Sequence, residues 1–432
     1  MTRTEHAQQS ARPDSEGAVP PADRDVLAML ERTLAYARER DYTGWDYGDG
    51  MSSRIRKALP IESKWVNIAF QETAKRTPVN VRPLLLVDQR RNYKGAALFA
   101  MANQTAARLV TGRETGGDHR SPGGDDRPRV ADWRLEAAAY REEARTLADW
   151  LVENQIDGYG GYCAGFPHPI QHLDGRGAPG EPDIVNTSFG VKALLRAASL
   201  DSAYADVVRS AGDFVIEELN FEHVASGRGA VVDYHNKHPQ DYYTINAGAL
   251  CARTFVDLYD HFGDPDFLEP ATELLDHVVD LQTDRGGWMY RDPPEASHLS
   301  MDTHHNGFII EAFQRYQQVT GDDRYDDRLD TALDFFRRDL FEDDGAPNFD
   351  EASAYPRDIH ASTQGALVFT YAGELDFARR ILEWVFENLH AGDGRFYYRK
   401  ERFYTRRVTL MRWCQAWMAF AMAEYLDARI AH

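Results

Sequence analysis

The chain has 432 residues, 69 acidic against 49 basic side chains, and a formal net charge of −20. An apolar fraction of 43% is enough for a substantial core, which excludes global disorder. The negative charge argues against nucleic acid and against an anionic membrane surface as main partners. There is no run of about 18 apolar residues that would span a membrane. The N-terminus lacks the apolar segment of a signal peptide, and the three Cys are too few and too scattered for a disulfide framework. These features predict a cytoplasmic location.

The basic residues are unevenly chosen, because seven are Lys and 42 are Arg. An acidic surface with little Lys is typical of a halophilic, archaeal protein, in which high salt screens the repulsion among acids. A GC-rich genome would also enrich Arg over Lys. The composition favours the salt-loving source, which is the more specific of the two explanations, and a GC-rich genome remains the alternative.

Two stretches of the chain are predicted to be unstructured. Residues 1–23 are polar with three Pro, and residues 113–131 are rich in Gly, Pro and charge, as in a flexible surface insertion. Elsewhere apolar residues recur at helical spacing. The predicted helices cover residues 25–40, 62–76, 92–111, 132–154, 184–199, 202–219, 242–262, 266–282, 303–320, 324–340, 359–372, 375–390 and 407–429.

Alternate helices carry a small residue near their start, at a nearly constant spacing. The central four of these markers are separated by 58, 59 and 58 residues: Gly190, Gly248, Gly307 and Gly365. Gly95 and Cys414 continue the pattern at the two ends. A second series of glycines, each followed by an aromatic residue within a few positions, precedes the later markers: Gly229, Gly287, Gly345 and Gly394. Each unit therefore reads as a Gly-aromatic turn, a polar loop and a pair of helices.

Six marker helices, each with a neighbouring amphipathic helix, predict an all-α fold in which six helix pairs close into an (α/α)6 toroid. The helix near 25–40 would complete the last pair. An open solenoid would end in a polar capping repeat, whereas the final helix, WCQAWMAFAMAEYL, is strongly apolar. Residues 24–432 are thus expected to form a single toroid domain, with short β-like hairpins in the loops at one mouth.

The repeat layout and turns such as Gly286-Gly287-Trp288 resemble the six-hairpin, (α/α)6-toroid superfamily of carbohydrate-active proteins. More narrowly, the segments YTGWDYGDGMSS, PVNVRPLL and RFYTRRVTLMRWCQAWM look like proteins found with archaeal and bacterial surface-glycan assembly systems. The first resemblance implies activity on sugars. The second implies a place in surface-glycan biosynthesis, such as archaeal N-glycosylation.

Loops that lead into the inner helices of a toroid ring one mouth, so residues at the same offset in each repeat should face one cavity. Seven positions before the markers stand mostly Asp residues: Asp88, Asp183, Asp241, Ser300, Asp358 and Arg407. One interpretation is that these Asp cap helix N-termini. The other is that one or two of them act as acid or base on a sugar.

Two units depart from the pattern in ways that suggest chemistry. Residues 285–307 add Asp302, His304 and His305, and residues 228–248 add Tyr234, His235 and Tyr243. Imidazoles transfer protons near neutral pH. The residues predicted to be catalytic are His304, His305, Asp302, Asp241, Tyr243 and Asp358. No zinc-ligand spacing and no phosphate-binding loop is present, so neither a metal nor a nucleotide cofactor is predicted.

Aromatic faces stack on sugar rings, and Arg holds hydroxyls or carboxylates. The residues predicted to bind substrate are Trp288, Tyr234, His235, Arg357, His360, Arg406, Arg407, Arg412 and Trp413. Together with Arg285 and Arg291, these Arg residues are expected to form a local cationic pocket for an anionic sugar. The alternative is that each Arg pairs with surface acids.

Three functions remain open from the sequence. The first is epimerisation or isomerisation of a uronic acid or related anionic sugar during surface-glycan or N-glycan assembly. The second is an inverting glycoside hydrolase that uses Asp302 with Asp241 or Asp358. The third is a non-catalytic glycan-binding assembly factor. The oligomeric state is not predictable from the sequence.

Overall fold

The computed structural model describes residues 19–115, 134–171, 176–225, 228–236 and 241–431. Most of the two stretches predicted to be unstructured, residues 1–23 and 113–131, lies outside these ranges. Within residues 1–23, however, the turn Pro21–Asp23 is ordered. The buried Asp23 carboxylate accepts hydrogen bonds from Tyr425 Oη at 2.7 Å and Arg429 Nε at 3.0 Å. The folded domain therefore begins before residue 24.

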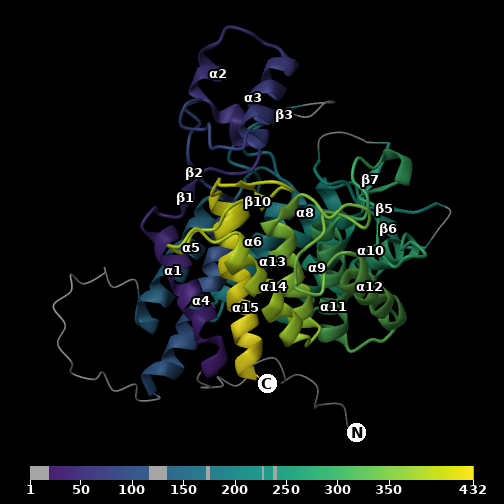
Figure 1. Cartoon of the computed structure of the whole chain (residues 1–432). Coiled ribbons are helices and arrows are strands. Elements are labelled where there is room, and N and C mark those ends of the chain that lie inside the picture. The colour runs from purple at the N-terminus through teal and green to yellow at the C-terminus, as the bar shows by residue number, and fades with distance from the viewer. Residues whose placement is uncertain (1–18, 116–133, 172–175, 226–227, 237–240, 432) are drawn as a thin grey trace.

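Six helices form an inner ring around one axis (Figure 1). Each contacts the next in chain order, and the last contacts the first, so the ring is closed. These are α4 (Tyr93–Thr115), α6 (Ile184–Ala197), α9 (Ile245–Phe262), α11 (Thr303–Thr320), α13 (Ile359–Tyr371) and α15 (Trp417–Ala431), the last preceded by a π-helical turn, Met411–Ala416.

An outer helix packs against each inner helix. These outer helices are α5 (Ala137–Glu153), α7 (Ala203–Val208) with α8 (Ala211–Glu218), α10 (Leu268–Asp280), α12 (Asp326–Asp339), α14 (Leu375–Asn388) and α1 (Arg24–Arg38). As predicted, α1 completes the last pair by packing against α15. The predicted all-α, closed (α/α)6 toroid is confirmed.

Short antiparallel strand pairs lie in the loops, again as predicted. They are β1 (Thr43–Gly44) with β2 (Arg90–Arg91), β3 (Ile170–Gln171) with β4 (Arg176–Gly177), β5 (Glu222–His223) with β6 (Ala230–Val231), β7 (Tyr243–Thr244) with β8 (Arg291–Asp292), and β9 (Arg357–Asp358) with β10 (Arg399–Lys400) and β11 (Thr405–Arg406). The chain between β1 and β2 also forms α2 (Arg54–Ala58) and α3 (Lys64–Arg76), which stand above the ring at the top of Figure 1.

The aromatic turns tie neighbouring units together. In five of the six inner segments, the first residue donates its backbone N–H to the carbonyl of an aromatic residue in another turn, at 2.9–3.2 Å. The pairs are Ile184 with Tyr234, Ile245 with Tyr290, Thr303 with Phe349, Ile359 with Tyr398, and Met411 with Trp45. These bonds satisfy amide groups that a helix start leaves unpaired. They also fix the amino ends of the inner helices relative to one another.

The turn glycines allow the same turns to approach the outer helices. Gly345 has φ +86°, and a Cβ built there would lie 2.7 Å from the Arg380 backbone in α14. Gly394 has φ +79° and stands equally close to the Arg32 backbone in α1. Only glycine combines this backbone conformation with such a close contact. The glycine repeat in the sequence therefore marks turn-to-helix packing.

A buried ionic layer fills the ring further along the inner helices. The Glu311 carboxylate contacts Arg253, lies 3.1 Å from Lys192 Nζ, and accepts a hydrogen bond from Gln364 at 3.0 Å. These groups come from α6, α9, α11 and α13. The layer occupies the interior beyond the first turns, which leaves the amino ends of the inner helices as the place for a site. Of the helices in the described ranges, none has the length and apolar character to cross a bilayer.

Candidate active site

The amino end of α11 holds one carboxylate between two imidazoles. Asp302 caps the helix by accepting the His305 backbone N–H at 3.1 Å. Its Oδ1 lies 3.0 Å from His304 Nδ1, and its Oδ2 lies 2.7 Å from His305 Nδ1. An ionised carboxylate only accepts hydrogen bonds, so each Nδ1 carries the proton and each Nε2 is left as a base. The two imidazole side chains are 21% and 17% exposed, so solvent still reaches them.

Electrostatics favour an ionised Asp302 and a neutral His305. Burial disfavours the Asp302 carboxylate, but the two imidazoles overcome this and hold the pKa of Asp302 below its usual range. Burial lowers the pKa of His305 to about 4, against the attraction of Asp302. His305 is therefore a neutral imidazole at neutral pH, the form in which it accepts a proton.

A third imidazole, from α13, packs against the triad. The His360 ring lies 4.9 Å from the His304 ring at an interplanar angle of 29°, and 4.5 Å from both the Trp413 and the Trp417 ring. The side chain is buried, and neither ring nitrogen has a hydrogen-bond partner among the described residues. Burial lowers the pKa of His360 well below its usual value. A buried polar group without a partner is costly, which points to a binding role.

Lys94, at the start of α4, is the unpaired cation of this region. Its Nζ lies 5.3 Å from the Phe189 ring, 5.8 Å from the Phe308 ring and 5.4 Å from the Trp417 ring. In the part of the chain that the structure describes, the Nζ has no ion pair. Burial and then the nearby Arg412 lower its pKa well below the usual value, while Asp183 opposes them. An anionic ligand would supply the missing partner.

The π-helical turn before α15 adds an ion pair and an aromatic stack. Arg412 Nε donates to Asp46 Oδ2 at 2.8 Å, and both side chains are buried. The Trp413 ring stacks on Tyr47, with ring centroids 4.5 Å apart at 24°. Trp413 Nε1 donates to Asp358 Oδ1 at 2.9 Å. π-Helical turns recur at functional sites. Asp46 and Tyr47 come from the connection between α1 and α4, so that segment contributes to the site.

Asp183 is a second buried carboxyl at the same end of the ring. It caps α6, and its oxygens accept the Asn186 backbone N–H at 2.8 Å and the Asn186 side-chain amide at 2.7 Å. Burial raises the pKa of Asp183 to about 6, although these hydrogen bonds oppose the shift. Asp183 and Asp358 bear out the helix-cap interpretation for two of the four Asp that stand seven positions before a marker, and Asp302, five positions before its marker, caps α11.

The triad is also the one group in the described residues whose ligand-type atoms could surround a metal ion, since these atoms all lie within 4.8 Å of one another. Two imidazoles and one carboxylate are a donor set that suits a transition metal. However, each Asp302 oxygen already faces an imidazole N–H. The hydrogen bonds account for the geometry as it stands, and the absence of a metal stays a prediction.

The structure brings several predicted residues together at the amino ends of α11, α13 and the π-helical turn: Asp302, His304, His305, Asp358, His360, Arg412 and Trp413. Tyr234 lies at the start of α6, where its carbonyl accepts the Ile184 N–H, and the His235 ring meets the Tyr234 ring edge-on at 6.1 Å.

Other predicted residues lie elsewhere. Asp241 is exposed, and Tyr243 belongs to β7, paired with Asp292 of β8 and not with the imidazoles. Trp288 was expected to bind substrate. Instead it is buried in the core, stacked on Phe313, and its Nε1 donates to the Val278 carbonyl at 2.7 Å.

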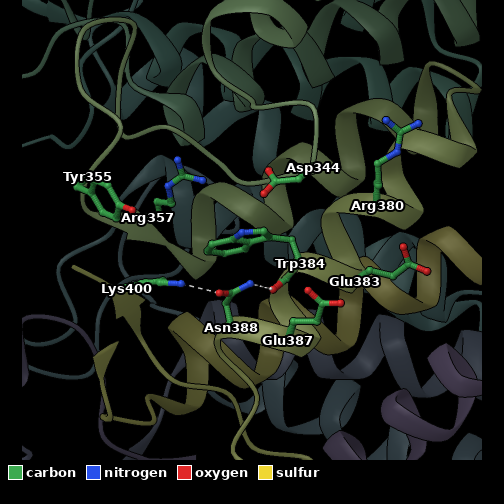
Figure 2. Close-up of a pocket in the computed structure, with 9 residues that line it drawn as sticks. All are labelled: Asp344, Tyr355, Arg357, Arg380, Glu383, Trp384, Glu387, Asn388 and Lys400. Atoms are coloured by element: carbon green, nitrogen blue, oxygen red, sulfur yellow. Dashed lines mark hydrogen bonds between the residues drawn. The ribbon is translucent and has the colours of Figure 1, made fainter. Parts of the chain in front are cut away.

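Of the six Arg expected to share one mouth, Arg412 is the one that the described residues place beside Lys94, and the other five contact other groups. Arg285 pairs with Asp339 at 2.9 Å on the outer layer, and Arg291 lies over the Tyr242 ring. Arg406 donates to the Lys75 carbonyl at 2.6 Å, and Arg407 is exposed. Arg357 lines a separate hollow (Figure 2). Surface acids and loop carbonyls take up these cations, as the alternative interpretation holds.

The sequence analysis missed Lys94, Asp46, Tyr47 and the buried His168, which lines a small hollow together with Asp46. One signal was present for Lys94: a lysine directly precedes the marker Gly95 in an otherwise apolar helix start. Asp46 gave none, because its partner Arg412 lies 366 positions away.

Solved structures show the same fold. The chain is similar to a cellobiose 2-epimerase from Bacillus thermoamylovorans (TM-score 0.58, 15% identity, covering 78% of this chain and 88% of that chain). It is also similar to an unsaturated glucuronyl hydrolase specific for heparin (TM-score 0.58, 12% identity, 94% and 96% covered). A third is a GH76 alpha-mannanase from Bacteroides thetaiotaomicron (TM-score 0.55, 13% identity, 79% and 86% covered). No protein-family model and no curated protein sequence matches the chain. At these identities the likeness shows the fold.

Proposed function

We propose that the chain is a sugar isomerase or epimerase that acts on an anionic sugar, with Asp302 and His304 at the centre of the chemistry. The observation that carries this proposal is the arrangement at the start of α11, where one buried carboxylate orients two imidazoles. This arrangement leaves Nε2 atoms free to move a proton, which is the central step of both reactions.

The imidazole geometry favours isomerisation over epimerisation. The ring centroids of the two bases, His304 and His305, lie 3.7 Å apart, which leaves no room for a sugar between them. Both bases therefore approach a substrate from one side. In isomerisation, His304 Nε2 takes the proton from the carbon next to the carbonyl and returns it to the former carbonyl carbon on the same face, while a hydroxyl proton moves to the carbonyl oxygen. Epimerisation would need a second group on the opposite face.

Two cations and an aromatic pair support an anionic sugar as substrate. Lys94 has no ion-pair partner within the described residues, and Arg412 is the other buried cation nearby. A substrate carboxylate would pair with Lys94, and the Trp413–Tyr47 stack offers an aromatic face for a sugar ring. The names of fold neighbours, a cellobiose 2-epimerase and a D-mannose isomerase, are in keeping with this chemistry.

The surface-glycan or N-glycan setting, a halophilic archaeal source and a cytoplasmic location are part of the proposal. They rest on the sequence resemblance and on composition.

Incubation with hexuronates and neutral aldoses in deuterated water tests the proposal. We expect deuterium at the carbon beside the carbonyl of a hexuronate, with conversion to the keto isomer, and at most slow exchange of the neutral aldose. Treatment with a chelator should leave the rate unchanged, because the triad is complete without an ion. Absence of exchange with every sugar tested would contradict the proposal. A rate that falls on treatment with a chelator would instead indicate that the triad binds a metal ion.

A glycoside hydrolase is the second candidate, favoured by Asp183. A carboxyl whose pKa is about 6 is protonated often enough to act as general acid. This candidate predicts release of reducing ends from uronide glycosides without deuterium incorporation at carbon, so a parallel incubation with uronide glycosides in deuterated water separates the two functions.

A further inference from the structure

A hollow of about 690 Å³ lies beside the outer helix α14, and no residue of the imidazole triad lines it (Figure 2). It is bounded by α14, by the loop before β9 and by the strands β9 and β10. Its lining is mixed, with two aromatic residues, three cations, three acids and an amide: Tyr355, Trp384, Arg357, Arg380, Lys400, Asp344, Glu383, Glu387 and Asn388. Figure 2 shows the Trp384 indole in the middle of this set, with Tyr355, Arg357 and Lys400 on one side.

Two cations face each other across the strands that form the inner wall. Arg357 of β9 and Lys400 of β10 are partners in register, so their side chains share one face of the sheet. Like charges in this position repel and destabilise a sheet unless something neutralises them. Arg357 has a single carboxylate nearby, the exposed Glu342 at 3.6 Å, and Lys400 Nζ donates to the Asn388 amide oxygen at 2.6 Å. Within the described ranges, Lys400 has no carboxylate partner.

The neighbouring strand pair, β10 with β11, has a carboxylate of the kind that the Arg357–Lys400 pair lacks. Arg399 of β10 and Arg406 of β11 are also partners in register and also carry like charges. There the Glu401 carboxylate lies 3.0 Å from Arg399 Nε and 2.5 Å from Arg406 Nε, so one negative charge is shared between the two cations. The Arg357–Lys400 pair has the same geometry without a shared carboxylate.

We infer that this hollow binds a carboxylate-bearing saccharide, with the carboxylate seated between Arg357 and Lys400. Arg presents a fork of donors that matches a carboxylate, and Lys adds a point charge. The Tyr355 ring, 36% exposed, supplies a face for the sugar ring, and the Trp384 indole, 6% exposed, lines the hollow beside it. The three acids stand at the exposed rim, where they repel anions that do not reach the inner cations.

The strand β9 lies between the hollow and the candidate active site. Arg357 lines the hollow, while the next residue, Asp358, turns to the other face, caps α13 and accepts the Trp413 N–H. The hollow is therefore a second saccharide site, suited to holding a distant uronate unit of a glycan. The inference stands on the lining of the hollow and does not depend on the chemistry at the triad.

Calorimetric titration of the full chain with tri-galacturonate tests the inference, with maltotriose as a neutral saccharide and citrate as an anion without a sugar ring. We expect tri-galacturonate to bind and the other two to bind at least about tenfold more weakly. Arg357→Gln and Tyr355→Ala should each weaken tri-galacturonate binding by about tenfold or more, a loss of about 1.4 kcal/mol. Arg402→Gln, an exposed Arg just after β10, is the matched control and should bind as the wild type does.

Each other outcome counts against the inference in a defined way. Equal binding of citrate and tri-galacturonate would reduce the hollow to a general anion site. Unchanged binding in both Arg357→Gln and Tyr355→Ala would place the saccharide elsewhere. His304→Gln should abolish turnover while leaving the affinity attributable to Arg357 intact. Failure of the proposed reaction and failure of this site are therefore separable.

Discussion

At the scale of single residues, the site is built from histidines kept neutral by burial. Burial lowers the pKa of both His305 and His168 to about 4, and it also lowers that of His360 well below the usual value. Such groups bind a proton more readily in the unfolded chain than in the fold. Their contribution to stability is present above the unfolded pKa of about 6.5 and is lost as the pH falls toward 4.

The direction of this pH dependence can be tested at His168, which is buried and has no hydrogen-bond partner on Nε2 among the described residues. In the wild type, the free energy of unfolding should fall as the pH drops from 6.5 to 4. In His168→Gln the unfolded chain takes up one proton fewer over this range. The slope of the free energy of unfolding against pH should therefore be smaller by up to about 1.4 kcal/mol per pH unit. Urea denaturation at several pH values measures it. An unchanged slope would mean that His168 is not held neutral by the fold.

The sequence identifies residues of the site only where they interrupt the repeat. Asp302, His304 and His305 stand at the start of a helix whose position the repeat fixes, so their placement was predictable. Trp288 obeys the repeat, and it proves to be core. Asp46 was beyond prediction, because a contact between the first loop and the last helix depends on ring closure.

At the scale of elements, helix positions were predictable because each helix carries its own apolar period. Residues 303–320 agree at both ends with α11. The predicted helix 202–219 is instead divided into α7 and α8. Ser210 stands at this break, where its hydroxyl accepts the Tyr162 N–H at 3.0 Å and its carbonyl meets Gly161. That contact is tertiary and leaves no signal in the helical period.

The turn glycines offer a matched test of the packing between units. Gly345 and Gly373 both have positive φ, +86° and +79°, but only Gly345 has a neighbour in the way, since nothing lies within 4 Å of a Cβ built at Gly373. Gly373→Ala should cost about 1 kcal/mol of stability from the backbone conformation alone. Gly345→Ala should cost about 1–3 kcal/mol more, because Arg380 must move. Equal losses in thermal or urea unfolding would show that the turn does not pack tightly on α14.

At the scale of the whole molecule, closure of the ring creates the site. The contact between α15 and α4 brings Arg412 beside Gly95 and Lys94, although more than 300 positions separate them in the sequence. The ionic layer around Glu311 fills the ring below, and the aromatic turns fix the helix starts above. The toroid was predictable from the repeat count. The chemistry required the structure, because the site draws on five of the six units and on the segment before α2.

The central claim is that Asp302 orients His304 and His305 for proton transfer, and Asp302→Asn tests it most directly. The amide keeps a side-chain oxygen for the helix cap but cannot accept both Nδ1–H groups as a carboxylate does. With the hexuronate that exchanges deuterium, we expect the exchange rate at saturation to fall by about 100-fold or more, with substrate affinity changed little. Thermal unfolding of the variant checks that it is folded. A folded Asp302→Asn variant that exchanges deuterium within about threefold of the wild-type rate would contradict the claim.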